Sequence, residues 1–345
     1  MIRIFFLKLS AIVLPIALLV VFTNYYIDPA NLFSSKQYVS GIADILAKGH
    51  NVNNIANYDE RLFQEQMITK IGYKPDIVIL GSSRIMEIGT DFFTNKKVLN
   101  CGVSHGNIND VVAIMGVLDS VGKLPKKVII NVDPFLICKG GSIEWQTLYA
   151  YYTSLINKID INNKKIARVQ SDKFYSLISF DYFEKSLKFK IDGNNKKYED
   201  AGQQKPSKYG RYSDGSICYP DSYTHADTIK VSLDAKDAAI RDQTEFDTSR
   251  LVLLNNLLDF LNKNKVDAEF VMLPFQHEYY TIRSQLTENA LEFYKNIFIE
   301  LGKKRNINII GDFDPLKTGV TKSQFYDTYH CSREAIKKIF TTPIL

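Results

Sequence analysis

Three residues near opposite ends of this chain have the side chains of a nucleophilic hydrolase. Ser83 lies in the segment ILGSSR, and Asp327 lies three residues before His330 in the segment FYDTYHCS. A serine hydroxyl becomes a nucleophile when a histidine accepts its proton, and a carboxylate orients that histidine and stabilises its protonated form. A Gly-Ser-Ser turn or an Asp-x-x-His loop is common by itself. The pair predicts a catalytic triad if the fold brings the two segments together.

The elements around these segments predict such a fold. Short apolar runs typical of buried strands cover 77–80, 96–102, 126–135, 268–275 and 307–313, and helical spacing covers 109–121, 247–263 and 287–304. Strands that alternate with helices form parallel α/β sheets, whose ligands bind at the carboxyl ends of the strands. We therefore expect a three-layer α/β domain with five parallel strands, in which Ser83 follows the first strand.

Two parts of the chain lie outside this pattern. Residues 28–74 are predicted to form a membrane-proximal helical stalk, followed by the main domain over 75–340. Residues 136–245, rich in Lys, Asn, Asp, Ser and Tyr, are too long for a plain loop and predict an insertion with its own helices that covers the site. Aromatic residues in it could stack on a sugar, but packing on the core is the favoured interpretation because aromatic side chains are mostly buried; they are Trp145, Tyr149, Tyr151 and Tyr152.

The first 27 residues predict a transmembrane signal-anchor. Arg3 and Lys8 precede an uncharged run over 9–27, whose length matches a hydrocarbon core of about 30 Å. A cleaved signal peptide is the alternative, but the run is long and no small-residue cleavage site follows it. Basic residues stay on the cytoplasmic side, so the rest of the chain is expected outside the cytoplasm, in a single-pass membrane protein.

The order and position of the two motifs resemble the SGNH (GDSL) hydrolase superfamily, over roughly 75–340 without the insertion. The resemblance implies a flavodoxin-like domain, Ser83 as nucleophile, Ser82 in place of the family's Asp after Gly81, and Asp327 and His330 as the last block. It also implies an oxyanion hole built from the Ser83 amide and a second block, NCGVSHGN, in which the amide of His105 or Gly106 would donate.

The third block of the family supplies an Asn side chain after the next strand. Here the strand runs INVDPF, so Asp133 occupies that position, and an amide is available only if Asn131 turns inward. An ionised carboxylate would repel a developing oxyanion. We expect the hole to be rebuilt, weaker or suited to another acceptor.

An N-terminal anchor with a GSS block resembles family members of the cell envelope, namely the D-alanylation protein of teichoic acid assembly and periplasmic acetylation proteins of exopolysaccharides. This resemblance implies a serine esterase or O-acyltransferase, polysaccharide O-acetylation or a similar acyl transfer, and a membrane-bound acyltransferase as partner. The alternatives are a catalytically impaired member that binds polymer or scaffolds an acylation complex, and a lipid or peptidoglycan hydrolase with the same triad.

The remaining sequence features exclude other classes or leave them open. The net charge of +5 is spread over the chain without the basic clustering of a nucleic-acid interface. No dinucleotide fingerprint or phosphate loop is present, and neither His225-Ala226-Asp227 nor His277-Glu278 has a third ligand at metal-site spacing, so we expect no cofactor and no metal. Four cysteines are compatible with disulfides, but four unpaired thiols are favoured; they are Cys101, Cys138, Cys218 and Cys331.

Overall fold

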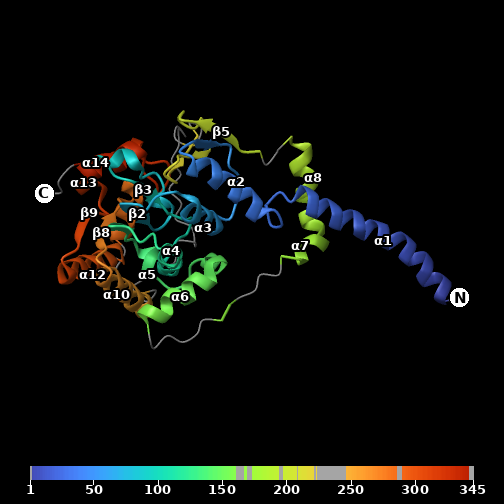
Figure 1. The fold of residues 1–345 in the computed structure, drawn as a ribbon, viewed down its shortest axis with the longest axis horizontal. Helices are drawn as coiled ribbons and strands as arrows, with labels where there is room; N and C mark the ends of the chain where they lie inside the picture. The colour runs from blue at the N-terminus through green and yellow to red at the C-terminus, as the bar shows by residue number, and fades with distance from the viewer. Residues whose placement is uncertain are drawn as a thin grey trace.

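The structure is a computed structural model that describes residues 2–160, 167–168, 173–193, 197–207, 209–220, 223, 246–285 and 290–341. A long N-terminal helix extends from one side of a globular α/β body (Figure 1).

The centre of the body is a five-stranded parallel sheet in the order β3-β2-β4-β8-β9. Counted along the chain these are its second, first, third, fourth and fifth strands, which is the flavodoxin-like order. All five predicted strands are present, with the bounds β2 Ile77–Leu80, β3 Val98–Asn100, β4 Lys127–Asn131, β8 Asp267–Met272 and β9 Asn308–Gly311. The strand order reverses between β2 and β4, so a crevice for a ligand is expected beyond the carboxyl ends of these two strands.

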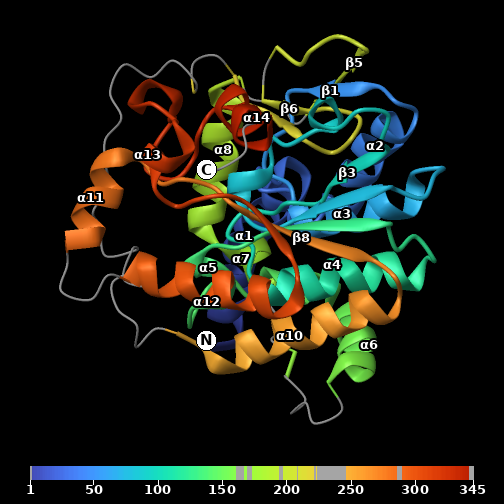
Figure 2. The same ribbon diagram turned by 90° about the vertical axis from the view of Figure 1, so that its left-hand side faces the viewer.

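Each face of the sheet buries alternate strand residues under helices. Val78 and Leu80 belong to the larger apolar core, whereas Ile77 and Ile79 belong to a smaller core on the other face. The larger core is covered by α3 (Glu60–Lys70), α4 (Ile108–Ser120), α6 (Tyr149–Ile159), α10 (Thr248–Lys263) and α12 (Ala290–Arg305), of which α4, α10 and α12 lie along one side of the sheet in Figure 2. The helix α14 (Arg333–Thr341) covers the smaller core through Ile336 and Ile339. The predicted three-layer arrangement is therefore confirmed.

The helices of the body begin and end close to where periodicity placed them. Asp247 caps α10 by accepting a hydrogen bond from the Ser249 amide, and Asn107 and Asp110 form a capping box at the start of α4. The bounds are α3 Glu60–Lys70, α4 Ile108–Ser120, α5 Pro134–Ile137, α6 Tyr149–Ile159, α10 Thr248–Lys263, α11 His277–Gln285, α12 Ala290–Arg305, α13 Pro315–Thr318 and α14 Arg333–Thr341.

The segment predicted as a stalk has its helices, but they belong to the globular body. In α2 (Ser35–Ala47), Val39, Ile42 and Leu46 are buried in the larger core, together with Phe63 and Met67 of α3. Spacing along one helix shows an apolar face without showing what covers it. A stalk standing apart from the domain is therefore wrong for residues 35–70.

The predicted insertion is divided among three places. α6 packs on α4 in the core, whereas α7 (Tyr175–Ile178) and α8 (Phe180–Ile191) pack on the N-terminal helix. Three short strands pair around β1 (Asn51–Asn53) in a second sheet, in the order β5-β1-β6-β7; they are β5 Glu199–Gly202, β6 Gly210–Arg211 and β7 Ile217–Cys218. Most of 221–245, including His225 and Asp227, lies outside the described residues.

The N-terminal helix α1 (Ile2–Ile27) is long and apolar enough to cross a membrane. At 1.5 Å per residue, its 26 residues extend about 39 Å, more than a hydrocarbon core of about 30 Å. Its apolar side chains are mostly exposed, which is costly in water and favourable in lipid.

Candidate active site

Ser83 stands on a tight turn at the carboxyl end of β2. Gly81 has φ of +146°, and a Cβ at this position would lie 2.5 Å from Cβ of Asn131 in the neighbouring strand β4. Glycine is therefore required for the chain to leave the sheet here. Ser82 then caps a short 3₁₀ turn, Ser83–Ile85, by accepting a hydrogen bond from the Arg84 amide. Ser83 is partly exposed at the first position of that turn.

The fold brings Ser83, His330 and Asp327 together in the predicted arrangement. Oγ of Ser83 lies 2.8 Å from Nε2 of His330, and Nδ1 of His330 lies 2.9 and 2.8 Å from the two carboxylate oxygens of Asp327. An ionised carboxylate only accepts, so Nδ1 carries the proton and Nε2 is left to accept from the serine hydroxyl. The contacts fall within the range needed for a general base and its nucleophile.

The loop that carries Asp327 and His330 is held by its own backbone. Oδ1 of Asp327 accepts hydrogen bonds from the amides of Tyr329 and His330, each at 2.8 Å, which explains the three-residue spacing. The hydroxyl of Tyr223 donates to Oδ2 at 2.9 Å. Burial raises the pKa of Asp327, but hydrogen bonds from His330 and Tyr223 outweigh this effect and hold the pKa below its usual value. Asp327 is thus ionised at neutral pH.

Arg84 connects the Ser83 turn to the Asp-His loop, and this residue was not predicted from the sequence. Its buried guanidinium donates to the carbonyls of Leu273 and Pro274, at 2.6 and 2.8 Å, and to the carbonyl of Tyr329 at 3.1 Å. It also stacks on Phe275, 4.0 Å from the ring centroid. The only local sign of this role was that Arg84 is a charged residue in a segment that is otherwise suited to burial.

The residue at the third-block position, Asp133, is held by several neighbouring groups. The Asp133 carboxylate is buried, caps α5 by accepting from the Leu136 amide, accepts from the Ser82 hydroxyl at 3.1 Å and lies 3.9 Å from Nη1 of Arg84. Burial raises the pKa of Asp133, although Arg84 and Ser82 oppose this. Asp133 therefore connects the start of α5 to the turn that carries Ser82 and Ser83.

The side chain of Asn131 is buried, but its amide group donates to a neighbouring strand of the sheet. Oδ1 accepts from Ser82 at 2.9 Å, and Nδ2 donates to the carbonyl of Val271 at 3.3 Å. Asn131 thus supports the nucleophile turn through Ser82.

The two candidate amides of the second block differ in their availability. The amide of Gly106 donates to the Val103 carbonyl at 3.1 Å, so this predicted oxyanion donor is already engaged. His105 has φ of +53° and is exposed. Within the described residues, the amides of His105 and Ser83 have no hydrogen-bond acceptor. This loop packs against Gly81, because a Cβ on Gly106 would lie 2.5 Å from the Gly81 carbonyl oxygen. Of the three predicted donors, the amides of Ser83 and His105 thus remain without an acceptor among the described residues.

A cluster of tyrosines lies beside the Asp-His loop. Tyr223 and Tyr326 have ring centroids 5.6 Å apart, both contact Tyr219, and Tyr219 contacts Tyr209 at 5.9 Å. Tyr219 and Tyr223 come from the predicted insertion, so this part of it does reach the site. Sequence spacing gave no sign of this cluster, because Tyr326 lies more than a hundred residues after Tyr209, Tyr219 and Tyr223.

Tyr209 also lines a groove that joins the membrane-proximal segment to the loop before Gly106. The lining includes Ala30 and Lys173, near the end of α1, and Ser104 and His105, near the nucleophile turn. The groove passes Tyr58 and Tyr209 on the way. Ser83, Asp327 and His330 are not among its lining residues, so the groove ends beside the loop that precedes Gly106.

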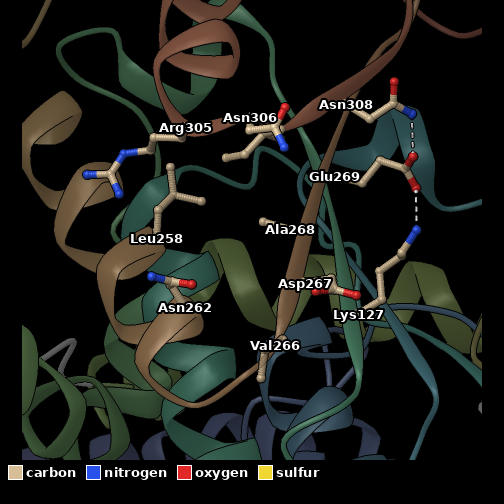
Figure 3. A pocket seen from close by; sticks show the side chains of 11 residues that line it. Lys127, Leu258, Asn262, Val266, Asp267, Ala268, Glu269, Arg305, Asn306 and Asn308 are labelled. Carbon is tan, nitrogen blue, oxygen red and sulfur yellow. Dashed lines mark hydrogen bonds and ion pairs between the residues drawn. The ribbon is translucent and has the colours of Figure 1, made fainter.

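The other features that the sequence or the surface offers as sites lie away from Ser83, Asp327 and His330. The pocket in Figure 3 is lined by Lys127, Glu269 and Asn308, at the amino ends of the strands and thus opposite Ser83. Trp145 and Tyr152 are buried and pack 4.2 Å apart, which confirms that these aromatics pack in the core. The four cysteines are buried, and none of them forms a disulfide. No cluster of three metal-ligating side chains is found in the part of the chain that the structure describes.

A scan of the chain against protein-family models finds no match, and a search of curated proteins finds no similar sequence. The roles of Ser83, Asp327 and His330 are therefore inferred from the geometry of the site alone.

Proposed function

We propose that this chain is a membrane-anchored SGNH-type serine enzyme that forms an acyl-enzyme on Ser83 and passes the acyl group to a cell-envelope glycan or to water. The observation that carries the proposal is the contact of 2.8 Å between Oγ of Ser83 and Nε2 of His330, with Asp327 on the other nitrogen. The flavodoxin-like strand order, with the serine after the first core strand and the Asp-His loop after the last, supports the family assignment.

The first half of the reaction uses His330 as a base. Nε2 accepts the hydroxyl proton while Oγ of Ser83 attacks the carbonyl carbon of an acyl donor. Asp327 stabilises the imidazolium, and the amides of Ser83 and His105 are the donors available to the oxyanion. The tetrahedral intermediate then collapses, the bond to the leaving group breaks, and the leaving group takes the proton from Nε2. The acyl group remains as an ester on Ser83.

The second half runs the same steps with an acceptor hydroxyl. His330 removes the proton from a sugar hydroxyl or a water molecule, the resulting oxygen attacks the Ser83 ester, and the proton returns to Oγ of Ser83 as the product leaves. Tyrosine faces suit sugar rings because they are apolar and carry a hydroxyl at the edge. The cluster of Tyr209, Tyr219, Tyr223 and Tyr326 supports a glycan acceptor.

The location that fits this chemistry is the outer face of a membrane. The helix α1 is the anchor, and Arg3 and Lys8 at its start favour a cytoplasmic N-terminus. The groove from Ala30 to His105 supports delivery of an acyl donor from the membrane side, for which we propose a membrane-bound acyltransferase as partner.

A second candidate is a polymer-binding protein without turnover. It is favoured by the engagement of the Gly106 amide with Val103 and of the Asn131 amide with Val271, because one lost oxyanion donor costs about 10²–10³ in rate.

Labelling with a fluorophosphonate probe separates the two candidates. We expect the full chain in detergent to be labelled, Ser83→Ala to be unlabelled and His330→Ala to be labelled far more slowly, because the probe reports an activated serine. Leu316→Ala, a change at an exposed residue of α13, serves as the control and should label like the wild type. Absence of label on the folded wild type would favour the binding protein.

Acyl transfer and hydrolysis are separated by the fate of the acyl group. With a chromogenic acetyl ester and an envelope oligosaccharide, a transferase yields acetylated sugar, whereas an esterase yields acetate alone. A lipid or peptidoglycan hydrolase would instead release product from lipid or peptidoglycan when no acetyl ester is present.

A further inference from the structure

The helices α7 and α8 carry apolar side chains that the globular body does not cover. Phe180 of α8 is 67% exposed and Ile191 is 81% exposed. Phe174, Tyr175 and Ile178 in and before α7 are also more than half exposed. Exposed apolar surface of this extent on neighbouring elements marks a site of contact with a membrane or a protein.

The same two helices are fastened to the end of α1. The side chain of Asn24 is fully buried, and its Nδ2 lies 2.9 Å from the carbonyls of Ser176 and Leu177 and 3.0 Å from that of Ser179. A polar side chain in a membrane helix is costly unless it finds such partners. Asn24 therefore fixes α7 and α8 at the depth of the last turns of α1.

A second set of contacts fixes the connection just after α1. The hydroxyl of Tyr182 donates to Oδ1 of Asp28 at 2.8 Å. The carboxylate of Asp28 also accepts from the amides of Leu32 and Phe33, at 2.7 and 3.0 Å. Burial raises the pKa of Asp28, but these hydrogen bonds outweigh it and leave the pKa below its usual value, so the group is charged. Charged Asp28 marks the level at which the chain leaves the apolar layer.

The direction of α8 is that of a helix lying in a membrane surface. In Figures 1 and 2, α8 runs across the axis of α1 rather than along it. A helix that crosses a transmembrane helix at its end lies near the plane of the bilayer. Helical spacing places Tyr182 and Ser186, which are buried on α1, opposite the exposed Phe180, Leu187 and Ile191.

The polar residues of this region fit lipid headgroups. Lys188 and Lys190 lie on α8 among aromatic and aliphatic residues, whereas Lys185 pairs with Asp181 at 2.8 Å and Lys173 donates to the Leu32 carbonyl at 3.2 Å. Lysine-rich amphipathic helices with Phe and Leu on the apolar face insert to the boundary of headgroups and acyl chains. Long lysine stems also let the ammonium reach the headgroups from beside apolar surface.

We infer that α7 and α8 form an interfacial foot that inserts into the lipid leaflet around the end of α1. The occupant of the apolar face is lipid, because α7 and α8 pack on the end of α1, whose own apolar side chains are mostly exposed. The inference rests on α1 as the membrane span proposed above, but not on its orientation or on the chemistry at Ser83. The foot fixes the distance and tilt of the body, and with them the opening of the groove near Ala30 and Lys173.

The test places an environment-sensitive fluorophore on single added cysteines of the full chain in nanodiscs of phosphatidylglycerol and phosphatidylethanolamine. The foot positions are Phe180→Cys and Ile191→Cys. The matched control is Leu316→Cys in α13, which is 78% exposed on the globular body, and Leu14→Cys reports whether α1 lies in the bilayer. The native cysteines are buried, and the parent chain gives their background.

We expect blue-shifted emission at 180 and 191 and loss of intensity when spin-labelled lipid is added, with water-like emission and no quenching at 316. Water-like emission at 180 and 191 would overturn the inference. Blue-shifted emission that lipid does not quench would also overturn it, since a protein partner or a second copy would then cover the face. Quenching at 14 without quenching at 180 and 191 overturns the foot alone, whereas an unquenched label at 14 overturns the anchor as well.

Discussion

Replacing Asp327 by asparagine tests how the acid acts on His330. Oδ1 accepts two backbone amides, so the side-chain oxygen of the asparagine would keep that position and its NH₂ group would replace Oδ2. The NH₂ group would then face Nδ1 of His330 at the present 2.8 Å. Nδ1 would then face a donor at 2.8 Å beside the amide oxygen at 2.9 Å, which favours the tautomer with the ring proton on Nε2, and in that tautomer the base cannot take the proton of Ser83.

The same replacement in another Ser-His-Asp triad lowers the rate about 10⁴-fold, or about 5.5 kcal/mol in the barrier. We expect a similar loss in the second-order rate of fluorophosphonate labelling. Tyr223→Phe is the matched comparison, because it removes one hydrogen bond to the same carboxylate and leaves the tautomer of His330 intact. A net hydrogen bond of about 0.5–1.5 kcal/mol corresponds to a loss of only about 2- to 12-fold.

The result that refutes this reasoning is an Asp327→Asn variant that labels within about tenfold of the wild type, since orientation of the tautomer would then not be the function of the acid. Thermal unfolding of both variants checks that a slow rate does not come from loss of the fold.

Three further outcomes follow from other parts of the molecule. Gly81→Ala should cost about 1–3 kcal/mol of stability in urea unfolding and slow labelling, because its Cβ meets Asn131; an unchanged midpoint would contradict the geometry of the turn. Burial raises the pKa of Glu87 to about 8, so the folded state retains a proton that the unfolded chain releases near 4.5, and stability should fall as pH rises between these values. Glu87→Gln should flatten the dependence of Tm on pH in this window, and an unaltered slope would show that another group titrates. N-terminal sequencing of protein from membranes should begin at or near Met1, because cleavage near Asp28 would remove Asn24 from its contacts with α7 and α8; a soluble form starting near Asp28 would show a signal peptide instead.

The positions of the strands and of the triad could be predicted from the sequence because both have local signals. Apolar runs bounded by turn residues mark the strands, and a parallel sheet brings their carboxyl ends to one edge. The serine after the first strand and the Asp-x-x-His loop after the last were therefore expected to converge. Their contact distances agree with that expectation.

The parts that could not be predicted depend on contacts between distant segments. Nothing near Asn24 shows that its side chain donates to carbonyls more than 150 residues away, so α7 and α8 were assigned to a cover over the site. Similarly, α2 and α3 have apolar faces that fit a stalk or a core equally well. The sequence also does not show the partners of Asp133, which was expected to oppose an oxyanion. Ser82 and Arg84 lie close to its carboxylate only in the folded chain.

The central claim is that Ser83 forms a covalent acyl-enzyme with His330 as its base. The most direct measurement is mass spectrometry of the full chain after brief exposure to a chromogenic acetyl ester and acid quenching, with fragmentation of the peptide that contains Ser82 and Ser83. We predict one added acetyl group on Ser83, none in Ser83→Ala, and a strongly reduced yield in His330→Ala. An acetyl group on another residue, or one on Ser83 that persists at the same rate in His330→Ala, would contradict the mechanism.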